Sequence, residues 1–292
     1  MKQKRLTHLE KTELFTKYQT GNYTAVDLSK EYNITNVAIS ALLKRHGFIS
    51  KSQSELQRKY FINENFFDII DTEEKSYILG LLYADGYNNI NRNSVNLSLQ
   101  EKDKKVLEQI TELIQPTKPL QFILASKKIG FEKSNHQYRL VIANKHISNQ
   151  LLNLGCIQTK TFKITFPTEE QVPKELQRHF IRGYFDGDGY IGICKKKGLI
   201  DIVGTKDLCD SFASIFKNEL NINTYQRQRF PERKNNIWSI AISGNKQIKL
   251  FCDYIYNEAT IYIERKHIKY KEFLDLNAAV NIKNYRDKCT QI

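Results

Sequence analysis

Two aspartates, Asp85 and Asp188, each end a short apolar stretch and are each followed by glycine. Both fall in the last turn of an expected helix, where the peptide dipoles already place about half a negative charge. If the two helices pair in parallel, both carboxylates and both negative helix ends meet in one small region. Carboxylate oxygens suit Mg²⁺ and other hard divalent ions. The pattern therefore predicts a divalent-metal site, Mg²⁺ or Mn²⁺, formed by Asp85 and Asp188.

The helices that must position these carboxylates read S-Y-I-L-G-L-L-Y-A-D-G-Y over 76–87 and F-I-R-G-Y-F-D-G-D-G-Y over 180–190. Small residues recur four positions apart in both, and four residues make about one helical turn, so they share one face. This spacing predicts a helix interface with closely approaching backbones, formed by Gly80, Ala84, Gly183 and Gly187. The glycine after each aspartate is expected to stop its helix in the left-handed conformation.

Asp-Gly is also a common turn signal, so one copy alone is best explained as an ordinary capped helix. Two copies in register favour the paired site instead. The motif glycines lie 103 residues apart, Asp103 and Asp207 lie 104 apart, and two Asn-Lys pairs lie 101 apart. A nearly constant offset predicts an α+β fold made of two pseudo-symmetric αββαββα repeats, with boundaries at 71–165 and 166–277.

The first repeat shows the expected order of elements. A helix begins near Asp71, and alternating apolar and polar residues predict a half-buried strand ending at Gln100. A helix over 102–114, strands near 120–126 and 138–143, and a helix over 146–154 follow. The polar face of the first long strand carries Asn96, Ser98 and Gln100, which are able to read bases by hydrogen bonding.

Residues 1–50 form a separate basic unit, joined to the repeats by a connector over 51–70, and residues 278–292 form a C-terminal tail. Thr24 and Thr35 are expected to cap two short helices separated by a tight turn, a helix-turn-helix pattern. Its expected core is Val26, Leu28, Ile34, Ile39 and Leu42 or Leu43. The residues expected to face DNA are Asn36, Ser40, Lys44 and Arg45. A helical packing unit that touches no DNA is the alternative.

The chain has a net charge of +13, with 45 Lys plus Arg against 32 Asp plus Glu. Such a balance indicates a polyanionic partner, and nucleic acid is favoured over an anionic membrane because no basic amphipathic helix with a bulky apolar face is evident. Charge that serves only solubility is the alternative. Basic residues concentrate in expected hairpins, which predicts further DNA contacts by Lys195, Lys196, Lys197, Arg227, Arg229 and Arg233.

The five cysteines are widely spaced and include no C-x-x-C pair, which favours a reducing compartment. The N-terminus has no apolar run behind its positive charges, so neither a signal peptide nor a membrane span is expected. We therefore expect a cytoplasmic, organellar-matrix or nucleoid-associated protein.

The two motifs, I-L-G-L-L-Y-A-D-G over 78–86 and I-R-G-Y-F-D-G-D-G over 181–189, resemble the signatures of the LAGLIDADG homing endonuclease family in its single-chain form. The resemblance implies saddle-shaped antiparallel sheets on double-stranded DNA and signature helices at a pseudo-twofold interface in a monomer. It also implies metal-dependent cleavage of both strands at a long site, leaving 3′ overhangs, with Asp85 and Asp188 as metal ligands. Family members often carry a lysine in each half, for which Lys160 and Lys266 are the candidates. Tyr83 departs from the signature, which has an aspartate there.

Two other functions fit the same pattern. One is a DNA-binding regulator that keeps the fold without cleavage, although such a protein is expected to lose one of the carboxylates. The other is an intron maturase, which uses this surface for RNA. An intein is not expected, because the chain starts with Met1 and ends at Ile292 without a His-Asn junction.

Overall fold

A computed structural model describes residues 6–19, 23–48, 60–125, 135–158, 162–194, 197–233 and 235–289. The chain divides into two compact units, Met1–Phe61 and Ile62–Ile292. Phe66, Phe67 and Ile70 are buried in the core of the second unit. The last part of the expected connector therefore belongs to that unit.

The first unit contains α1 (His8–Gln19), α2 (Ala25–Tyr32) and α3 (Asn36–Arg45). Thr24 and Asp27 form a reciprocal capping box at the start of α2, and Thr35 accepts a hydrogen bond from the Ala38 N–H at the start of α3. Between these two helices, Asn33 takes the left-handed conformation that a tight turn requires. The local sequence thus places α2 and α3 where the capping residues predict them.

The core of this unit differs from the expected one at two points. Val26 is 41% exposed, whereas Leu14 of α1 and Tyr32 are buried beside Leu28, Ile39 and Leu43. The buried face of α2 is set by Leu28 and Tyr32, which are four residues apart, and Val26 lies about 200° away from Leu28 around the helix. The expectation for Val26 was therefore wrong, and α1 fills the space instead.

The second unit begins with α5 (Glu73–Asp85), which Thr72 caps through the Lys75 N–H. The first repeat continues through β1 (Gly86–Asn89), β2 (Ser94–Gln100), α6 (Lys104–Ile114), β3 (Gln121–Ile123), β4 (Gln137–Ala143) and α7 (Lys145–Asn153). Burial alternates residue by residue along β2, as expected of a strand with one core face. The strands form an antiparallel sheet in the order β1-β2-β4-β3.

The second repeat has the same order of elements. It comprises α8 (Gln177–Asp188), β5 (Gly189–Cys194), β6 (Lys197–Gly204), α9 (Lys206–Leu220), β7 (Tyr225–Gln228), β8 (Trp238–Ser243) and α10 (Asn245–Tyr256). Its antiparallel sheet has the order β5-β6-β8-β7, which matches the first sheet strand for strand. The α+β fold of two αββαββα repeats is confirmed.

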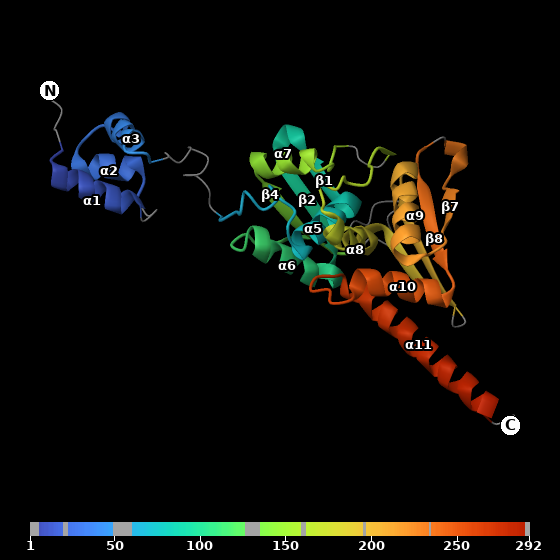
Figure 1. Ribbon diagram of the computed structural model, residues 1–292. Coiled ribbons are helices and arrows are strands. Elements are labelled where there is room, and N and C mark those ends of the chain that lie inside the picture. The colour runs from blue at the N-terminus through green and yellow to red at the C-terminus, as the bar shows by residue number, and fades with distance from the viewer. Residues whose placement is uncertain are drawn as a thin grey trace. The chain divides into compact units, whose positions relative to one another are not determined.

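In the second unit, α5 and α8 lie side by side, with one sheet associated with each (Figure 1). A single cluster of buried apolar residues runs through both repeats. After α10, the helix α11 (Glu264–Cys289) packs near β5 and α10 at its start and continues away from them (Figure 1). It extends through most of the segment that was expected to be a C-terminal tail.

Candidate functional site

The backbones of α5 and α8 touch at Gly80 and Gly183. A Cβ placed on Gly80 would lie 2.0 Å from the carbonyl oxygen of Phe180, and one on Gly183 would lie 2.0 Å from the carbonyl oxygen of Tyr77. No side chain fits at these distances, so the close approach requires glycine in both helices. Gly80 also neighbours Tyr184, while Gly183 neighbours Leu81, so the contacts advance in the same direction along both chains. The two helices are therefore parallel.

Further along the pair, Gly187 of α8 faces Ala84 of α5. A Cβ on Gly187 would lie 2.3 Å from the Ala84 Cβ and 3.0 Å from Asp85 Oδ2. One methyl group therefore occupies a space that has no room for two. The contact also places the Asp85 carboxylate against the residue that precedes Asp188, so the two helix ends converge.

Both helices end at a glycine, but not in the conformation that the sequence suggested. Gly86 has φ −76° and Gly189 has φ −89°, which is extended backbone rather than the left-handed region. Glycine is needed for space instead, because a Cβ would lie 2.5 Å from the carbonyl oxygen of Leu82 or Phe185 in the preceding turn. The strands β1 and β5 start at these same glycines, so each carboxylate sits at a direct junction of helix and strand.

The carboxylates of Asp85 and Asp188 are exposed to solvent at these junctions. Burial raises the pKa of Tyr184, and the negative charges of Asp188 and Asp85 raise it further. The Tyr184 hydroxyl donates to the carbonyl oxygen of Val203 at 2.8 Å, which fixes the ring beside the junction. Both carboxylates thus affect the pKa of the same tyrosine, as expected if they converge.

Lys266 places a positive charge at the C-terminal end of α8. Its side chain is 4% exposed, and its ammonium group donates to the carbonyl oxygens of Phe185, Gly187 and Gly189, the last at 2.6 Å. Burial lowers the pKa of Lys266 to about 8, against the opposing effect of nearby carboxylates that include Asp85 and Asp188. The ammonium group of this candidate lysine therefore lies against the negative end of α8, where the sequence also predicted a metal ion.

The donor set at the junctions suits a magnesium ion that takes only part of its shell from protein. Within the described ranges, no group of three or more His, Cys, Asp or Glu side chains is arranged to hold a metal. Mg²⁺ commonly binds through one or two carboxylates and completes its octahedron with water and substrate phosphate oxygens. Asp85 and Asp188, exposed side by side, fit this mode.

Asp186, which sequence reasoning did not single out, is buried completely between the two repeats. It accepts hydrogen bonds from the Tyr77 hydroxyl at 2.8 Å, the Tyr256 hydroxyl at 2.7 Å and the Ile263 N–H at 2.7 Å. Burial raises its pKa, and these donors together with Lys266 oppose that rise. The signal available in the sequence was its place in the motif, because Tyr83 stands at the equivalent position 103 residues earlier.

Arg182 is a second buried charge on the same side of the pair. Its guanidinium donates to the carbonyl oxygens of Ile261 at 3.0 Å and Ile255 at 2.9 Å, and to Glu73 Oε1 at 2.6 Å. It also donates to His179 Nδ1, and burial lowers the pKa of that histidine to about 4. The imidazole is therefore neutral at pH 7, and Arg182 joins the start of α5 to the end of α10.

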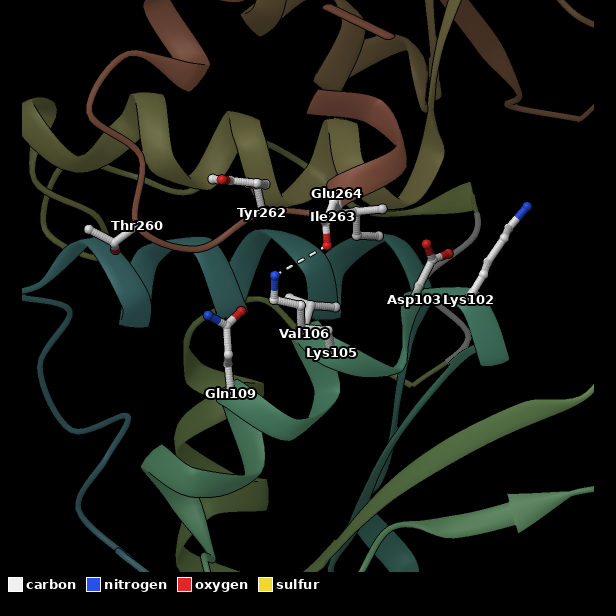
Figure 2. Close-up of a pocket in the computed structure, with 9 residues that line it drawn as sticks. All are labelled: Lys102, Asp103, Lys105, Val106, Gln109, Thr260, Tyr262, Ile263 and Glu264. Carbon is white, nitrogen blue, oxygen red and sulfur yellow. Dashed lines mark hydrogen bonds and ion pairs between the residues drawn. The ribbon is translucent and has the colours of Figure 1, made fainter. Parts of the chain in front are cut away.

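The segment 260–265 fastens the second repeat to the first. Arg265 Nε lies 3.0 Å from both carboxylate oxygens of Asp103, and Lys105 Nζ lies 3.2 Å from Glu264 Oε2. Figure 2 shows this segment lying along the start of α6, where the two together line a cavity of about 200 Å³. These contacts fix the position of the chain just before Lys266.

The solvent-facing side of the first sheet carries the polar residues that the strand pattern predicted. Asn96, Ser98 and Gln100 alternate with the buried Val95, Leu97 and Leu99. Arg139 of β4 lies opposite Ser98 and donates to its hydroxyl at 2.8 Å. This face is mostly neutral and offers both donors and acceptors.

The corresponding side of the second sheet is more basic. Lys197 begins β6 and is exposed, while Arg227 of β7 donates to the Ser239 hydroxyl at 3.3 Å. Arg229 follows β7, and its N–H donates to the carbonyl oxygen of Ile237 at 2.8 Å. Lys160, Lys195 and Lys196, and the side chain of Arg233, lie outside the described residues.

On α3, the residues expected to face DNA do not all lie on one side of the helix, because Asn36 and Arg45 are nine residues apart, which is about 180° around the axis. Asn36, Lys44 and Arg45 are exposed, and the partly exposed Ser40 donates weakly to Asn36 Oδ1 at 3.5 Å. Val37, which the sequence analysis did not include, is 79% exposed on the same helix.

Comparison with known proteins supports the fold. Residues 175–256 match the family model of a LAGLIDADG-like domain. The structure of the homing endonuclease I-WcaI bound to its DNA recognition sequence is similar, with a TM-score of 0.51 and 13% identity, covering 77% of this chain and 95% of that one. This likeness shows a shared LAGLIDADG-type fold.

Other similarities are weaker. Full-length DUF199/WhiA from Thermotoga maritima has a TM-score of 0.45 and 17% identity, covering 78% of this chain and 72% of that one. A probable translation initiation factor IF-2 of Methanocaldococcus jannaschii is 22% identical over 257 residues, which is 83% of this chain. This chain spans about a fifth of the length of that relative, 19%. Across the described part of the chain, we find no helix with the length and apolar character to span a bilayer.

Proposed function

We propose that this protein is a site-specific double-strand DNA endonuclease that acts as a single chain on a long recognition site. The observation that carries the proposal is the convergence of Asp85 and Asp188 at the ends of two parallel helices whose backbones touch. Each carboxylate is joined directly to the first strand of its own sheet. The arrangement provides one acidic group for each strand of a duplex, with a reading surface on either side.

Three features support DNA as the substrate. The net charge of +13 favours binding to a polyanion such as the DNA phosphate backbone. The outer faces of the two sheets carry Asn, Gln, Ser and Arg side chains, which contact base edges and phosphates in protein–DNA complexes. The similar I-WcaI protein is a homing endonuclease that was solved on its DNA recognition sequence. We assign Asn36, Ser40, Lys44 and Arg45 of α3 to an additional DNA contact made by the first unit.

Asp85 and Asp188 would hold Mg²⁺ or Mn²⁺. When bound there, such an ion would supply a water of lowered pKa and would stabilise negative charge on the leaving oxygen of the phosphodiester. The protein contributes the fixed positions of the two carboxylates. The Lys266 ammonium group, at the end of α8, offsets part of their negative charge. Lys160 is the candidate for the corresponding role in the first repeat. The proposed products carry 3′ overhangs.

The test is cleavage of a duplex library that contains the native locus, with Mg²⁺ and with EDTA. We expect cutting at one sequence in Mg²⁺ and none in EDTA, with 3′ overhangs at the sequenced ends. Asp85→Asn and Asp188→Asn should each reduce cutting at least about hundredfold, because the metal contributes several kcal/mol to the transition state. DNA binding should persist in both variants. Asp275→Asn, which changes an exposed acid on α11, is the matched control.

The same experiment separates the alternatives. Tight, sequence-specific binding of duplex DNA without cutting in Mg²⁺ or Mn²⁺ would overturn the nuclease proposal in favour of a regulator. Preferential binding of folded intron RNA over any duplex would overturn it in favour of a maturase.

A further inference from the structure

The registers of the two sheets identify a pair of equivalent positions with different chemistry. In the first sheet, Asn96 lies opposite Tyr87 on β1 and Val141 on β4. In the second sheet, Asp201 lies opposite Tyr190 on β5 and Ala241 on β8. Tyr87 and Tyr190 each come two residues after a motif aspartate. Asn96 and Asp201 therefore occupy the same place relative to Asp85 and Asp188.

Asp201 lacks the partners that a buried carboxylate normally has. It is 8% exposed, and no described residue donates a hydrogen bond to its Oδ1. The nearest cations are Arg227 Nη2 at 3.8 Å and Arg229 Nη1 at 3.9 Å from Oδ2, both beyond hydrogen-bonding distance. An unsatisfied buried acceptor is unfavourable and calls for an explanation.

The strand pattern places Asp201 on the outer face of the sheet. Ile200 and Ile202 are fully buried in the core, whereas Leu199 and Tyr190, on the same side as Asp201, are 44% and 56% exposed. Arg227 lies on β7, and its side chain extends across β8 towards Asp201. On β8 its Nε donates a hydrogen bond to the Ser239 hydroxyl. Among the described residues, the carboxylate has side-chain neighbours on this face from β7 and from the residue that follows it, Arg227 and Arg229.

An acidic side chain on a DNA-reading face repels phosphate, so its favourable partner is a donor on a base edge. In the major groove the amino group of cytosine N4 donates, and aspartate accepts from it. Asparagine at the equivalent position both donates and accepts, which matches N7 and N6 of adenine. The two sheets thus present different codes at one pair of symmetry-related positions.

We propose that Asp201 and Asn96 read symmetry-related base pairs and make the target asymmetric, with Asp201 selecting a C·G pair and Asn96 selecting an A·T pair. Arg227 and Arg229 neutralise Asp201 in the free protein and contact DNA once cytosine donates to the carboxylate. This inference rests on the proposed function, because it requires that the sheets bind duplex DNA.

The test is binding selection from a randomised duplex library, with EDTA present to prevent cutting. The wild type should select C·G at one position and A·T at its symmetry mate. Asp201→Asn should convert the first position from C·G to A·T and leave the second unchanged. Asn96→Asp should convert the second position from A·T to C·G and leave the first unchanged. Each exchange should change the preference about tenfold or more at its own position, as expected for one side chain reading one base pair.

Two further variants distinguish base reading from a structural role. Asp201→Ala should lose the preference at that one position and bind unrelated duplex more tightly, because a negative charge leaves a basic surface. Asp207→Asn removes an exposed acid at the start of α9 and should leave the selected sequence unchanged. Thermal unfolding of each variant checks that the fold is retained.

The outcomes separate this inference from the nuclease proposal. An unchanged selected sequence in both Asp201→Asn and Asn96→Asp would overturn the inference while leaving sequence-specific binding intact. Failure of Asp201→Asn to fold leaves Asn96→Asp, on the other sheet, to decide by the same criterion. A wild-type protein that selects no duplex sequence would overturn both.

Discussion

The two flanks of the α5–α8 pair differ in chemistry although the repeats share one topology. On the α8 flank, Arg182 and Asp186 are buried charges with several partners each. The equivalent residues of α5, 103 positions earlier, are Leu79 and Tyr83, and both are buried in apolar surroundings. The residues that face the partner helix or carry the carboxylates are alike in both copies, whereas those that face sideways have diverged. Symmetry is thus kept where two strands of a duplex would require it.

The difference has a structural origin in the chain after α10. The loop between α10 and α11 supplies the Ile261 carbonyl to Arg182 and the Ile263 N–H to Asp186. Lys266 follows three residues later and reaches the end of α8. The charged flank therefore depends on the segment after α10, which returns to the helix pair. The comparison of the two flanks can be tested in three ways.

The largest effect should come from Asp186→Ala compared with Tyr83→Phe. The first change leaves two tyrosine hydroxyls and one backbone N–H without their acceptor, so we expect a loss of about 4 kcal/mol in the free energy of unfolding. The second removes one hydrogen bond, from the Tyr83 hydroxyl to the Leu154 carbonyl oxygen at 2.5 Å, and should lose about 1 kcal/mol. Urea denaturation measures both. Equal losses would show that the two flanks contribute alike.

The next effect should be a rise in stability with pH that depends on Lys266. Burial lowers its pKa from 10.5 to about 8. Between these values the unfolded chain holds more protons than the folded one, so stability increases with pH through this window. Relative to Lys266→Met, the wild type should gain about 3 kcal/mol in unfolding free energy from pH 8 to 10.5.

The control for this measurement is Lys269→Met, which removes an exposed lysine from the same helix. It should keep the wild-type pH dependence. A wild-type curve parallel to that of Lys266→Met across the window would show that the ammonium group is better hydrated than its burial implies.

The smallest effect should come from exchanging the two small residues at the end of the pair. Gly187→Ala brings two methyl groups within 2.3 Å and should cost about 1–3 kcal/mol. Adding Ala84→Gly removes the clash, so the double variant should recover most of that stability by thermal or urea unfolding. Cleavage should recover less, because the new Cβ lies 3.0 Å from Asp85 Oδ2. A double variant as unstable as Gly187→Ala would contradict the one-methyl explanation.

Much of the fold could be predicted from local patterns. Capping residues such as Thr35 and Thr72 mark helix starts, and the alternation along β2 marks a strand with one buried face. The duplication offset supplied the order of elements in the second repeat. The reason given for Gly86 and Gly189 was wrong, because Asp-Gly signals a helix end without revealing whether backbone angle or lack of space requires the glycine.

The site could be predicted only in part. The spacing of Asp85 and Asp188 followed from the repeated motif, but the setting of Asp186 did not. Its donors come from Tyr77, Tyr256 and Ile263, between 70 and 109 residues away along the chain. A buried aspartate and an exposed one look the same in a sequence, and only the folded loop after α10 distinguishes them. The length of α11 also escaped prediction, because the residues that follow Glu264 are mostly polar.

Gly86 and Gly189 each serve as the end of a helix and the first residue of a strand. No loop separates each helix from its strand. Each carboxylate therefore lies at a nearly fixed distance from the residues of its sheet. Under the proposed function, the cut falls at a constant number of base pairs from every base that is read. Substitutions on the sheet faces would then redirect the enzyme to a new sequence while keeping the cleavage position within it.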